Sequence, residues 1–329
     1  MQKLLTIVVP VYKVEAYINK CRDSLLISPD LMEKLEVIIV NDGTPDDSAE
    51  MSREYVKRFP ETFRQIDKEN GGHGSAWNVG LKEASGKYLR FLDSDDWFTS
   101  LDCLMEDLEG TDVDLVFNPF IREYTYEERT EIIDVPQPMG NGLIDPSNWG
   151  VSRWGFHNVN FWAITYKVSL LKPLLPLFAE KTMFDDYILT WAVLVHGRTG
   201  LSLDYPVYHY LIGRPGQSMS LTQQRKGAIA YVNCFAQYEL VRSRIDPSEI
   251  PSEFLSGIDR TISEYAKFIF PFMAYLPFWN ACERMKYLWR NYVSAFPDRS
   301  KLMKRYSMMP GAVFYFVERL RLYINQARG

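Results

Sequence analysis

Three carboxylates stand within four positions of one another in the stretch YLRFLDSDDWF, residues 88–98. Asp93, Asp95 and Asp96 follow a run of strand-forming residues, and gathering them is unfavourable because like charges repel and lose solvation. A divalent cation offsets this cost, since Mg²⁺ and Mn²⁺ prefer hard oxygen ligands. Residues two apart in an extended segment point to one side, so Asp93 and Asp95 are predicted to share a metal ion.

A metal ion held in this way has a specific use in catalysis. Mg²⁺ is often bound by one or two carboxylates together with the phosphate oxygens of a substrate. The ion then stabilises the negative charge that develops on a diphosphate as it leaves. The acidic cluster therefore predicts a nucleotide-diphosphate substrate whose diphosphate is the leaving group.

The elements that must position this cluster alternate along the first hundred residues. Continuous apolar runs typical of buried strands lie at 4–12, 35–42, 63–69 and 87–93. Segments with helical spacing of apolar residues lie between them, at 14–26, 46–59 and 74–84. Such alternation predicts an α/β fold with a parallel sheet covered on both faces. Ligands of these folds bind beyond the carboxyl ends of the strands, which is where Asp42 and Asp93 stand.

Near residue 216 the sequence pattern changes from alternating strands and helices to helices alone. Residues 113–121 are expected to form a further strand, and the Pro- and Gly-rich stretch 135–150 to form a loop. Later segments are rich in aromatic residues and predict helices at 226–245, 252–276, 279–295 and 310–327. We therefore expect two domains, residues 1–215 and 216–329.

Charge and cysteine content narrow the class of protein. The net charge of −5 does not favour nucleic acid as a partner. Residues 283–329 contain ten Lys and Arg against three Asp and Glu, a net of +7, whereas residues 1–282 have a net of −12. The four cysteines are far apart, which argues against a zinc site or disulfides and favours a reducing, cytoplasmic compartment. No stretch is expected to form a bilayer-spanning helix.

Four stretches of this chain, in this order and spacing, resemble the family 2 glycosyltransferases. They are TIVVPVYKVEAYINKCRDSLL, EVIIVNDGTPDDS, ENGGHGSAWNVGLKEASGKYLRFLDSDDW and, more loosely, YHYLIGRPGQSMS. The resemblance is strong over residues 4–100 and moderate over residues 160–220. It implies the GT-A fold, with a Rossmann-like nucleotide-binding domain. It also implies an inverting hexosyltransferase of surface-polysaccharide synthesis that uses a nucleotide-sugar donor.

For the donor, the resemblance implies a nucleoside site at the ends of the first two strands. Pro10, Val11 and Tyr12 stand where the family packs the base and ribose, although Tyr12 is alternatively an ordinary half-buried strand residue. Glu15 occupies a position that often reaches the nucleoside. Asp42 would accept a hydrogen bond from the base, and because uracil offers its N3–H, a UDP-sugar is the expected donor.

The resemblance also assigns the metal contacts. Asp93 and Asp95 match the Asp-x-Asp motif of the family, and Asp95 is the expected direct ligand of Mn²⁺ or Mg²⁺. Ser94, which lies between them, is included among the donor-binding residues. Asp96 would not bind the metal directly but would orient the donor or the metal ligands.

One stretch departs from the common family pattern. Trp77 stands before Asn78 where an Arg is usual, so one phosphate or carboxylate partner is lost. His73 lies between glycines at a predicted helix start and is expected to take over part of that anion binding. The alternative for His73 is a solvated turn residue, and Asn78 is expected to cap or brace the site.

An inverting transfer needs a base that deprotonates the acceptor hydroxyl. The family places it in a short acidic motif at a helix start, and here KTMFDDYILTWAVL, residues 181–194, offers two aspartates. Asp186 is favoured by the register of the motif, and Asp185 is the second candidate. The common form is Glu-Asp, and helix capping is the alternative role for this pair.

The stretch YHYLIGRPGQSMS, residues 208–220, supplies further candidates. The Arg214 guanidinium suits a pair of diphosphate oxygens, and Gln217 and Ser218 would add hydrogen-bond donors. The family has a comparable mobile segment that closes over the donor. His209 is an alternative metal ligand, although the YHY triplet also fits a buried strand edge.

The C-terminal segment 283–329 combines ten basic residues with many aromatic ones. This composition suits an anionic membrane surface, and the alternative is a helical lid whose Lys and Arg face water. The membrane interpretation fits a lipid-linked saccharide acceptor. It also fits a cytoplasmic enzyme that is peripheral on the inner face of the membrane.

Two other functions compete with sugar transfer. A metal-dependent nucleotidyltransferase would also use paired carboxylates, but it would carry a Gly-rich basic loop where VPVYKVEAY has no glycine. A non-catalytic saccharide-binding protein on the same fold is the third hypothesis. The intact acidic cluster argues against it, whereas Trp77 and the Asp185–Asp186 pair keep it open.

Overall fold

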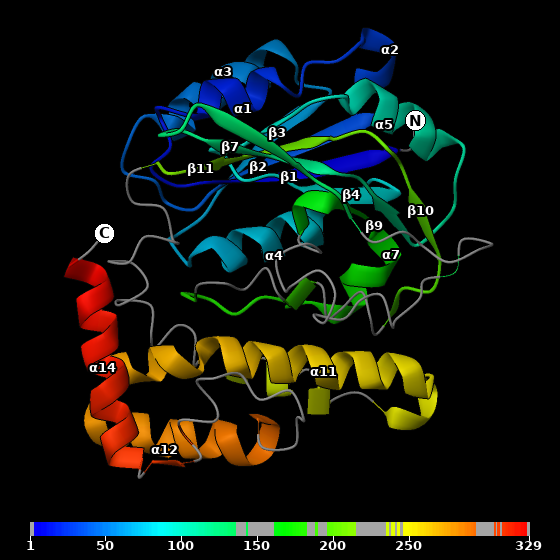
Figure 1. The fold of residues 1–329 in the computed structure, drawn as a ribbon. Helices are drawn as coiled ribbons and strands as arrows, with labels where there is room; N and C mark the ends of the chain where they lie inside the picture. The colour runs from blue at the N-terminus through cyan, green and yellow to red at the C-terminus, as the bar shows by residue number, and fades with distance from the viewer. Residues whose placement is uncertain are drawn as a thin grey trace. The chain divides into compact units, whose positions relative to one another are not determined.

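The computed structural model divides into two compact units, Met1–Pro215 and Gly216–Gly329 (Figure 1). In the first unit the structure describes residues 3–135, 143, 161–182, 188–189 and 196–214. In the second unit it describes residues 235–236, 238–240, 242–243, 246–293, 306, 308–309 and 311–327.

A seven-stranded sheet forms the core of the first unit, in the order β10-β6-β9-β4-β1-β2-β3. The strands are β1 Leu5–Val11, β2 Leu35–Asn41, β3 Phe63–Asp67, β4 Tyr88–Phe91, β6 Leu115–Phe117, β9 Ile164–Lys167 and β10 Gly200–Ser202. All pairs are parallel except those that β9 makes with β4 and β6. Every residue of β1, β2, β4 and β6 is buried, which explains why their sequences are continuously apolar. The predicted α/β architecture is confirmed.

Helices cover both faces of this sheet. They are α1 Ile18–Asp23, α2 Pro29–Met32, α3 Ser48–Arg58, α4 His73–Glu83, α5 Leu101–Glu109 and α7 Val168–Leu171. In Figure 1, α1 and α3 lie on one face and α4 on the other. Gly80 lets α4 approach β1 closely, because a Cβ atom there would lie 2.2 Å from Val8 Cγ1.

The predicted single strand at 113–121 is wrong, because the chain passes there from one sheet to another. It forms β6 in the large sheet and then β7, Phe120–Tyr124, in a second sheet. Pro119 lies between the two strands and has no N–H to continue the ladder. The second sheet has the order β5-β11-β7-β8, with β5 Trp97–Phe98, β8 Arg129–Ile133 and β11 Tyr208–Ile212.

The second unit is helical, as predicted. Its helices are α11 Ser252–Ile269, α12 Phe278–Leu288 and α14 Gly311–Ala327. A 3₁₀ segment, Phe270–Tyr275, continues α11, and a π turn, Trp289–Val293, continues α12. The predicted helix at 226–245 lies mostly outside the described residues. Among the residues that the structure describes, no helix is long and apolar enough to cross a bilayer.

Candidate functional site

The three aspartates form a tight turn directly after β4. We call residues 93–96 the acidic turn, which is closed by a hydrogen bond from Asp96 N to Asp93 O of 3.0 Å. One carboxylate oxygen from each of Asp93, Asp95 and Asp96 lies within 4.8 Å of the others. No other group of three potential ligands is found in the described part of the chain. The acidic turn therefore has the donor set that a hard divalent cation requires.

Asp96 faces the interior of the protein and is 1% exposed. Its Oδ2 accepts a hydrogen bond of 2.6 Å from the Tyr208 hydroxyl, and its Oδ1 accepts one of 2.8 Å from Leu211 N. The Tyr208 oxygen also accepts from Asp93 N at 3.1 Å. Burial, together with the nearby charges of Asp95 and Asp93, raises the pKa of the Asp96 carboxyl. Asp96 thus ties the acidic turn to β11, behind the other two carboxylates.

Asp95 is paired with a cation in this structure. Arg214, which follows β11, donates from Nε to Asp95 Oδ2, and its guanidinium lies 5.5 Å from the centre of the Tyr17 ring. Burial raises the pKa of Asp95, repulsion by Asp93 adds to this effect, and Arg214 opposes it. The arginine predicted to contact the diphosphate therefore already lies against the predicted metal ligand.

His73 is the first residue of α4 and lies against the acidic turn. Its Nε2 is 2.9 Å from Asp93 Oδ1, and its ring centre is 4.1 Å from that of Trp77. The preceding Gly72 has a φ of +88°, a conformation that glycine adopts readily. The structure thus adds a contact with Asp93, and the predicted binding of an anion by His73 stays a prediction.

Trp77 belongs to the hydrophobic core. It is fully buried, with ring centres 4.4, 4.7 and 5.1 Å from those of Phe91, Phe161 and Phe178. The sequence shows a lost arginine at this position but not the aromatic cluster that replaces it.

Asn78 braces a distant part of the chain. Its Oδ1 accepts hydrogen bonds from Leu177 N at 2.9 Å and Phe178 N at 3.0 Å, and its Nδ2 donates to Phe178 O at 2.7 Å. These bonds fix the 177–178 backbone against α4, and the expected capping or bracing of the site by Asn78 stays a prediction. Contact between Asn78 and the donor stays a prediction.

Asp42 follows β2 and organises the loop before α4. Its Oδ1 accepts from Lys68 Nζ at 2.7 Å and Gly71 N at 2.9 Å, and its Oδ2 accepts from Gly72 N at 2.8 Å. Asp42 is only 3% exposed, and the lone-pair count of Oδ2 allows one further hydrogen bond. Lys68 was not predicted from the sequence to be a site residue, although it directly follows β3 at the carboxyl end of the strand.

The predicted nucleoside residues differ in exposure. Pro10 and Val11 are buried in β1, and Val11 O accepts a hydrogen bond from Asp42 N at 3.0 Å, whereas Tyr12 is 43% exposed. Glu15 is exposed and accepts a hydrogen bond from Asp47 N at 3.4 Å. Lys13 Nζ lies over the Tyr12 ring, 5.3 Å from its centre, and stacking of a base on Tyr12 stays a prediction.

His209 has other partners than the acidic turn. Its ring stacks on Trp97 with 5.0 Å between ring centres, and its Nδ1 is 2.7 Å from Glu123 Oε1. Burial lowers the pKa of His209 against the opposing effect of Glu123. His209 is not among the clustered groups, and it lies within the second sheet, paired with Trp97 of β5 on one side and Ile121 of β7 on the other.

Four predicted site residues lie outside the described residues: Asp185, Asp186, Gln217 and Ser218. The segment that leads toward the two aspartates is described as far as Thr182. Lys181 N donates to Gly71 O at 2.7 Å, and Ser75 Oγ donates to Glu180 Oε1 at 3.2 Å. This segment is therefore joined to the same loop that Asp42 holds.

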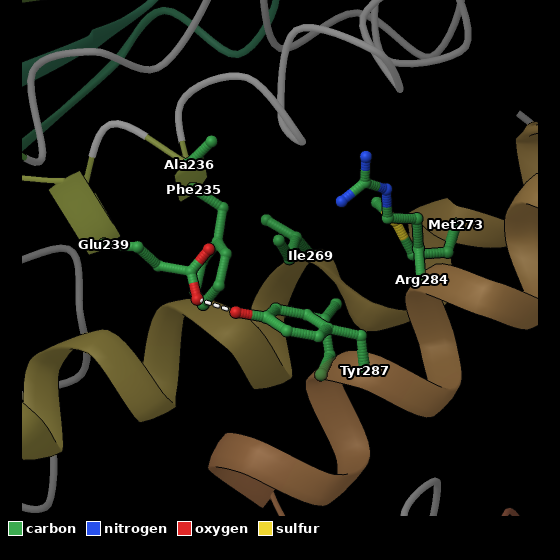
Figure 2. A pocket seen from close by; sticks show the side chains of 8 residues that line it. Phe235, Ala236, Glu239, Ile269, Met273, Arg284 and Tyr287 are labelled. Carbon is green, nitrogen blue, oxygen red and sulfur yellow. Dashed lines mark hydrogen bonds between the residues drawn. The ribbon is translucent and has the colours of Figure 1, made fainter.

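One pocket is lined only by residues of the second unit. Its lining residues are Phe235, Ala236, Glu239, Ile269, Met273, Arg284, Tyr287 and Leu288. Figure 2 shows the Tyr287 hydroxyl directed at Glu239, to which it donates a hydrogen bond. No residue of the acidic turn lines this pocket.

Comparison with known proteins identifies the family. The model of the family described as "Glycosyl transferase family 2" matches residues 6–143. The uncharacterized glycosyltransferase EpsJ of Bacillus subtilis is 31% identical over 249 residues, which cover 71% of each chain. The chain belongs to glycosyltransferase family 2. Another glycosyltransferase relative, the poly(ribitol-phosphate) beta-glucosyltransferase of Bacillus spizizenii, is 27% identical over 75% of this chain and 37% of its own.

Solved structures support the same fold. Staphylococcus aureus TarS 1–349 in complex with UDP-GlcNAc superposes with a TM-score of 0.53 and 17% identity, covering 89% of this chain and 91% of TarS 1–349. The mannosyltransferase PcManGT of Pyrobaculum calidifontis, in complex with GDP-Man and Mn²⁺, gives 0.54 and 16%, covering 97% and 88%. The predicted GT-A fold is confirmed for this glycosyltransferase.

Proposed function

We propose that this family 2 enzyme is an inverting, metal-dependent transferase that moves a sugar from a UDP-sugar to a saccharide acceptor. The observation that carries the proposal is the clustering of three carboxylates at the carboxyl end of β4. Asp42 follows β2, and β1 separates the two strands in the sheet. Ligands of parallel sheets bind at such strand ends.

The residues of the acidic turn fit Mn²⁺ or Mg²⁺. Asp93 and Asp95 would hold the ion, while Asp96 keeps the turn in place through Tyr208 and Leu211. When bound, the ion would neutralise charge on the departing diphosphate. Arg214 would then exchange its bond to Asp95 for the diphosphate oxygens, which suit its planar fork of donors.

The nucleoside would lie between the ends of β1 and β2. Tyr12 offers an exposed ring for stacking, and Asp42 Oδ2 keeps an acceptor position that suits the N3–H of uracil. Binding of UDP-GlcNAc by TarS, a protein of the same fold, supports a uridine donor. His73 would bind donor phosphate oxygens beside the acidic turn, where it contacts Asp93. Asn78 would brace the site by holding the backbone of Phe178.

Asp186 would be the base that takes the proton from the acceptor hydroxyl as its oxygen attacks the anomeric carbon. The diphosphate leaves from the opposite face of the sugar, so the anomeric configuration inverts. Support comes from the hydrogen bond of Lys181 to Gly71, which joins the segment before Asp185 and Asp186 to the Asp42 loop. Gln217 and Ser218, just beyond Arg214, would add donors to the diphosphate.

The acceptor would be a cell-surface polysaccharide or a lipid-linked precursor of one, used by a cytoplasmic enzyme. The poly(ribitol-phosphate) beta-glucosyltransferase among the relatives supports such a polymer.

Release of nucleotide diphosphate tests the proposal directly. The protein is incubated with Mn²⁺ and a panel of UDP-sugars, with GDP-mannose for comparison, and we expect UDP release with at least one UDP-sugar. The Asp95→Asn variant should release UDP at least about 10²-fold more slowly, whereas Asp102→Asn, at an exposed position of α5, should behave as wild type. Pyrophosphate release would indicate nucleotidyl transfer instead. No release together with no thermal shift by UDP would indicate a saccharide-binding protein.

Substitution of the two aspartates identifies the base. Asp186→Asn should retain UDP binding, measured by calorimetry, and lose transfer, because the amide cannot accept the acceptor proton. Asp185→Asn serves as the matched control and should retain transfer. The reverse result would assign the base to Asp185, and transfer by both variants would contradict a base in this motif.

A further inference from the structure

Helix α14 of the second unit carries an exposed apolar face opposite its buried one. Phe314 and Tyr315 are buried, and the Tyr315 hydroxyl donates to Leu276 O at 3.0 Å, which fixes the helix within its unit. Six apolar side chains of α14 are at least 37% exposed: Val313, Phe316, Val317, Leu320, Tyr323 and Ile324. At about 100° per residue they fall within an arc of about 120°. We call these six residues the outer face of α14.

An exposed tryptophan extends this surface onto α12. Trp279 is 79% exposed. The ring centre of Phe278 lies 5.1 Å from that of Trp279 and 5.7 Å from that of Phe316. Arg319 and Arg321 border the outer face on its two sides, since each lies about 40° beyond the apolar arc. Arg319 donates to the Tyr315 hydroxyl, and Arg321 pairs with Glu318 at 3.0 Å.

We propose that the outer face of α14, together with Trp279, binds an anionic bilayer surface with the helix lying in the plane of the membrane. The apolar arc would enter the boundary between headgroups and acyl chains, where Trp and Tyr are favoured. The flanking arginines would reach the phosphates while their aliphatic stems stay on apolar surface. The net charge of +7 on residues 283–329 complements anionic lipid.

The same observations disfavour two alternatives, a second copy of the chain bound to this face and a helix that spans the bilayer. A symmetric contact between two copies would bring two segments of charge +7 together, and like charges across an interface are repulsive. A spanning orientation is disfavoured because Glu318, Arg319 and Arg321 lie in the middle of the helix.

Vesicle flotation of the full chain tests the inference, without donor or metal so that sugar transfer plays no part. We expect the protein to float with phosphatidylglycerol-containing vesicles, to float far less with phosphatidylcholine vesicles, and to be released by salt. Leu320→Ser and Leu320→Glu should weaken partitioning by about tenfold or more, because both remove apolar burial from the centre of the outer face. Ile132→Glu is the matched control, since Ile132 on β8 is 62% exposed and Leu320 is 60% exposed.

Each outcome decides for or against the membrane surface. Circular dichroism and the unfolding temperature confirm that every variant is folded. The inference is overturned by absence of vesicle binding, by equal binding to neutral and anionic vesicles, or by equal losses in the Leu320 and Ile132 variants. Concentration-dependent dimerisation that Leu320→Glu abolishes, without vesicle binding, would identify a second copy as the occupant and overturn it as well.

Discussion

The three carboxylates of the acidic turn differ in their surroundings. Asp96 is bonded through both oxygens to Tyr208 and Leu211 and is buried. Asp93 and Asp95 instead contact His73 and Arg214, a titratable ring and a permanent cation. A divalent ion would take over the neutralising role of the Arg214 guanidinium.

Asp95→Asn tests the metal-binding role at the scale of one residue. The amide weakens the hold on a divalent ion, whose charge stabilisation is worth several kcal/mol, so turnover should fall by about 10²-fold or more. Calorimetry should show that Mn²⁺ no longer strengthens UDP binding. Wild-type Mn²⁺ dependence in this variant would contradict the assignment.

Tyr208→Phe tests whether the acidic turn depends on β11. The change leaves Asp96 Oδ2 buried without its donor, which costs about 1–3 kcal/mol of unfolding free energy. It should also weaken Mn²⁺ affinity by about 10–100-fold, as loss of groups that orient metal ligands does. Tyr124→Phe is the control, because Tyr124 lies on β7, next to β11, and its hydroxyl also donates to a carboxylate, that of Glu131 on β8, at 3.0 Å. Unchanged metal affinity in Tyr208→Phe would leave Tyr208 a purely structural residue.

At the scale of elements, packing of α4 on β1 places His73 against the acidic turn. Gly80→Ala would set a Cβ atom 2.2 Å from Val8 Cγ1, so the helix would have to shift. Overpacking of this kind costs about 1–3 kcal/mol, measured by urea denaturation. The control Gly110→Ala meets only Asp107 O at 3.7 Å and should change stability far less. Equal effects of both variants would contradict this account.

Glu36 joins several elements at the end of the sheet opposite the acidic turn. It accepts from Thr6 Oγ1 at 2.6 Å, Ser85 N at 2.8 Å and Arg64 Nε at 3.3 Å. Burial acts to raise the pKa of Glu36, but these hydrogen bonds and Arg64 outweigh it and lower the pKa below the ordinary value of 4.5. A lowered folded-state pKa contributes stability above the unfolded-state pKa, and this stability is lost as pH falls.

Acid titration of stability tests this role of Glu36. Between neutral pH and pH values below 4.5, the free energy of unfolding should fall more steeply in wild type than in Glu36→Gln. The exposed Glu106→Gln should parallel wild type. Identical curves for wild type and Glu36→Gln would refute the contribution.

At the scale of the whole molecule, charge is divided between the two parts of the chain. Residues 283–329 carry +7, whereas the acidic turn belongs to a stretch with a net charge of −12. The acidic turn belongs to the first unit and α14 to the second, so the two proposals concern different units. Leu320→Glu should leave UDP-sugar hydrolysis in vesicle-free solution at the wild-type rate, measured by UDP release. A loss of hydrolysis would show that α14 also contributes to the site.

Much of the first unit could be predicted because its signals are local. Strands buried on both faces are continuously apolar, and Asp residues at their ends mark the ligand side. The division of 113–121 into β6 and β7 could not be predicted in this way. It depends on pairing with β9 and β11, which come much later in the chain.

The sequence by itself determined the α/β architecture, the acidic turn and the family, since each follows from residue types at short spacing. Tertiary structure decided which side chains meet. It placed Trp77 in the core, His209 beside Glu123, and Arg214 on Asp95. The physical reason is that these contacts join residues far apart in the chain, and burial and pairing of charge depend on spatial neighbours rather than on spacing.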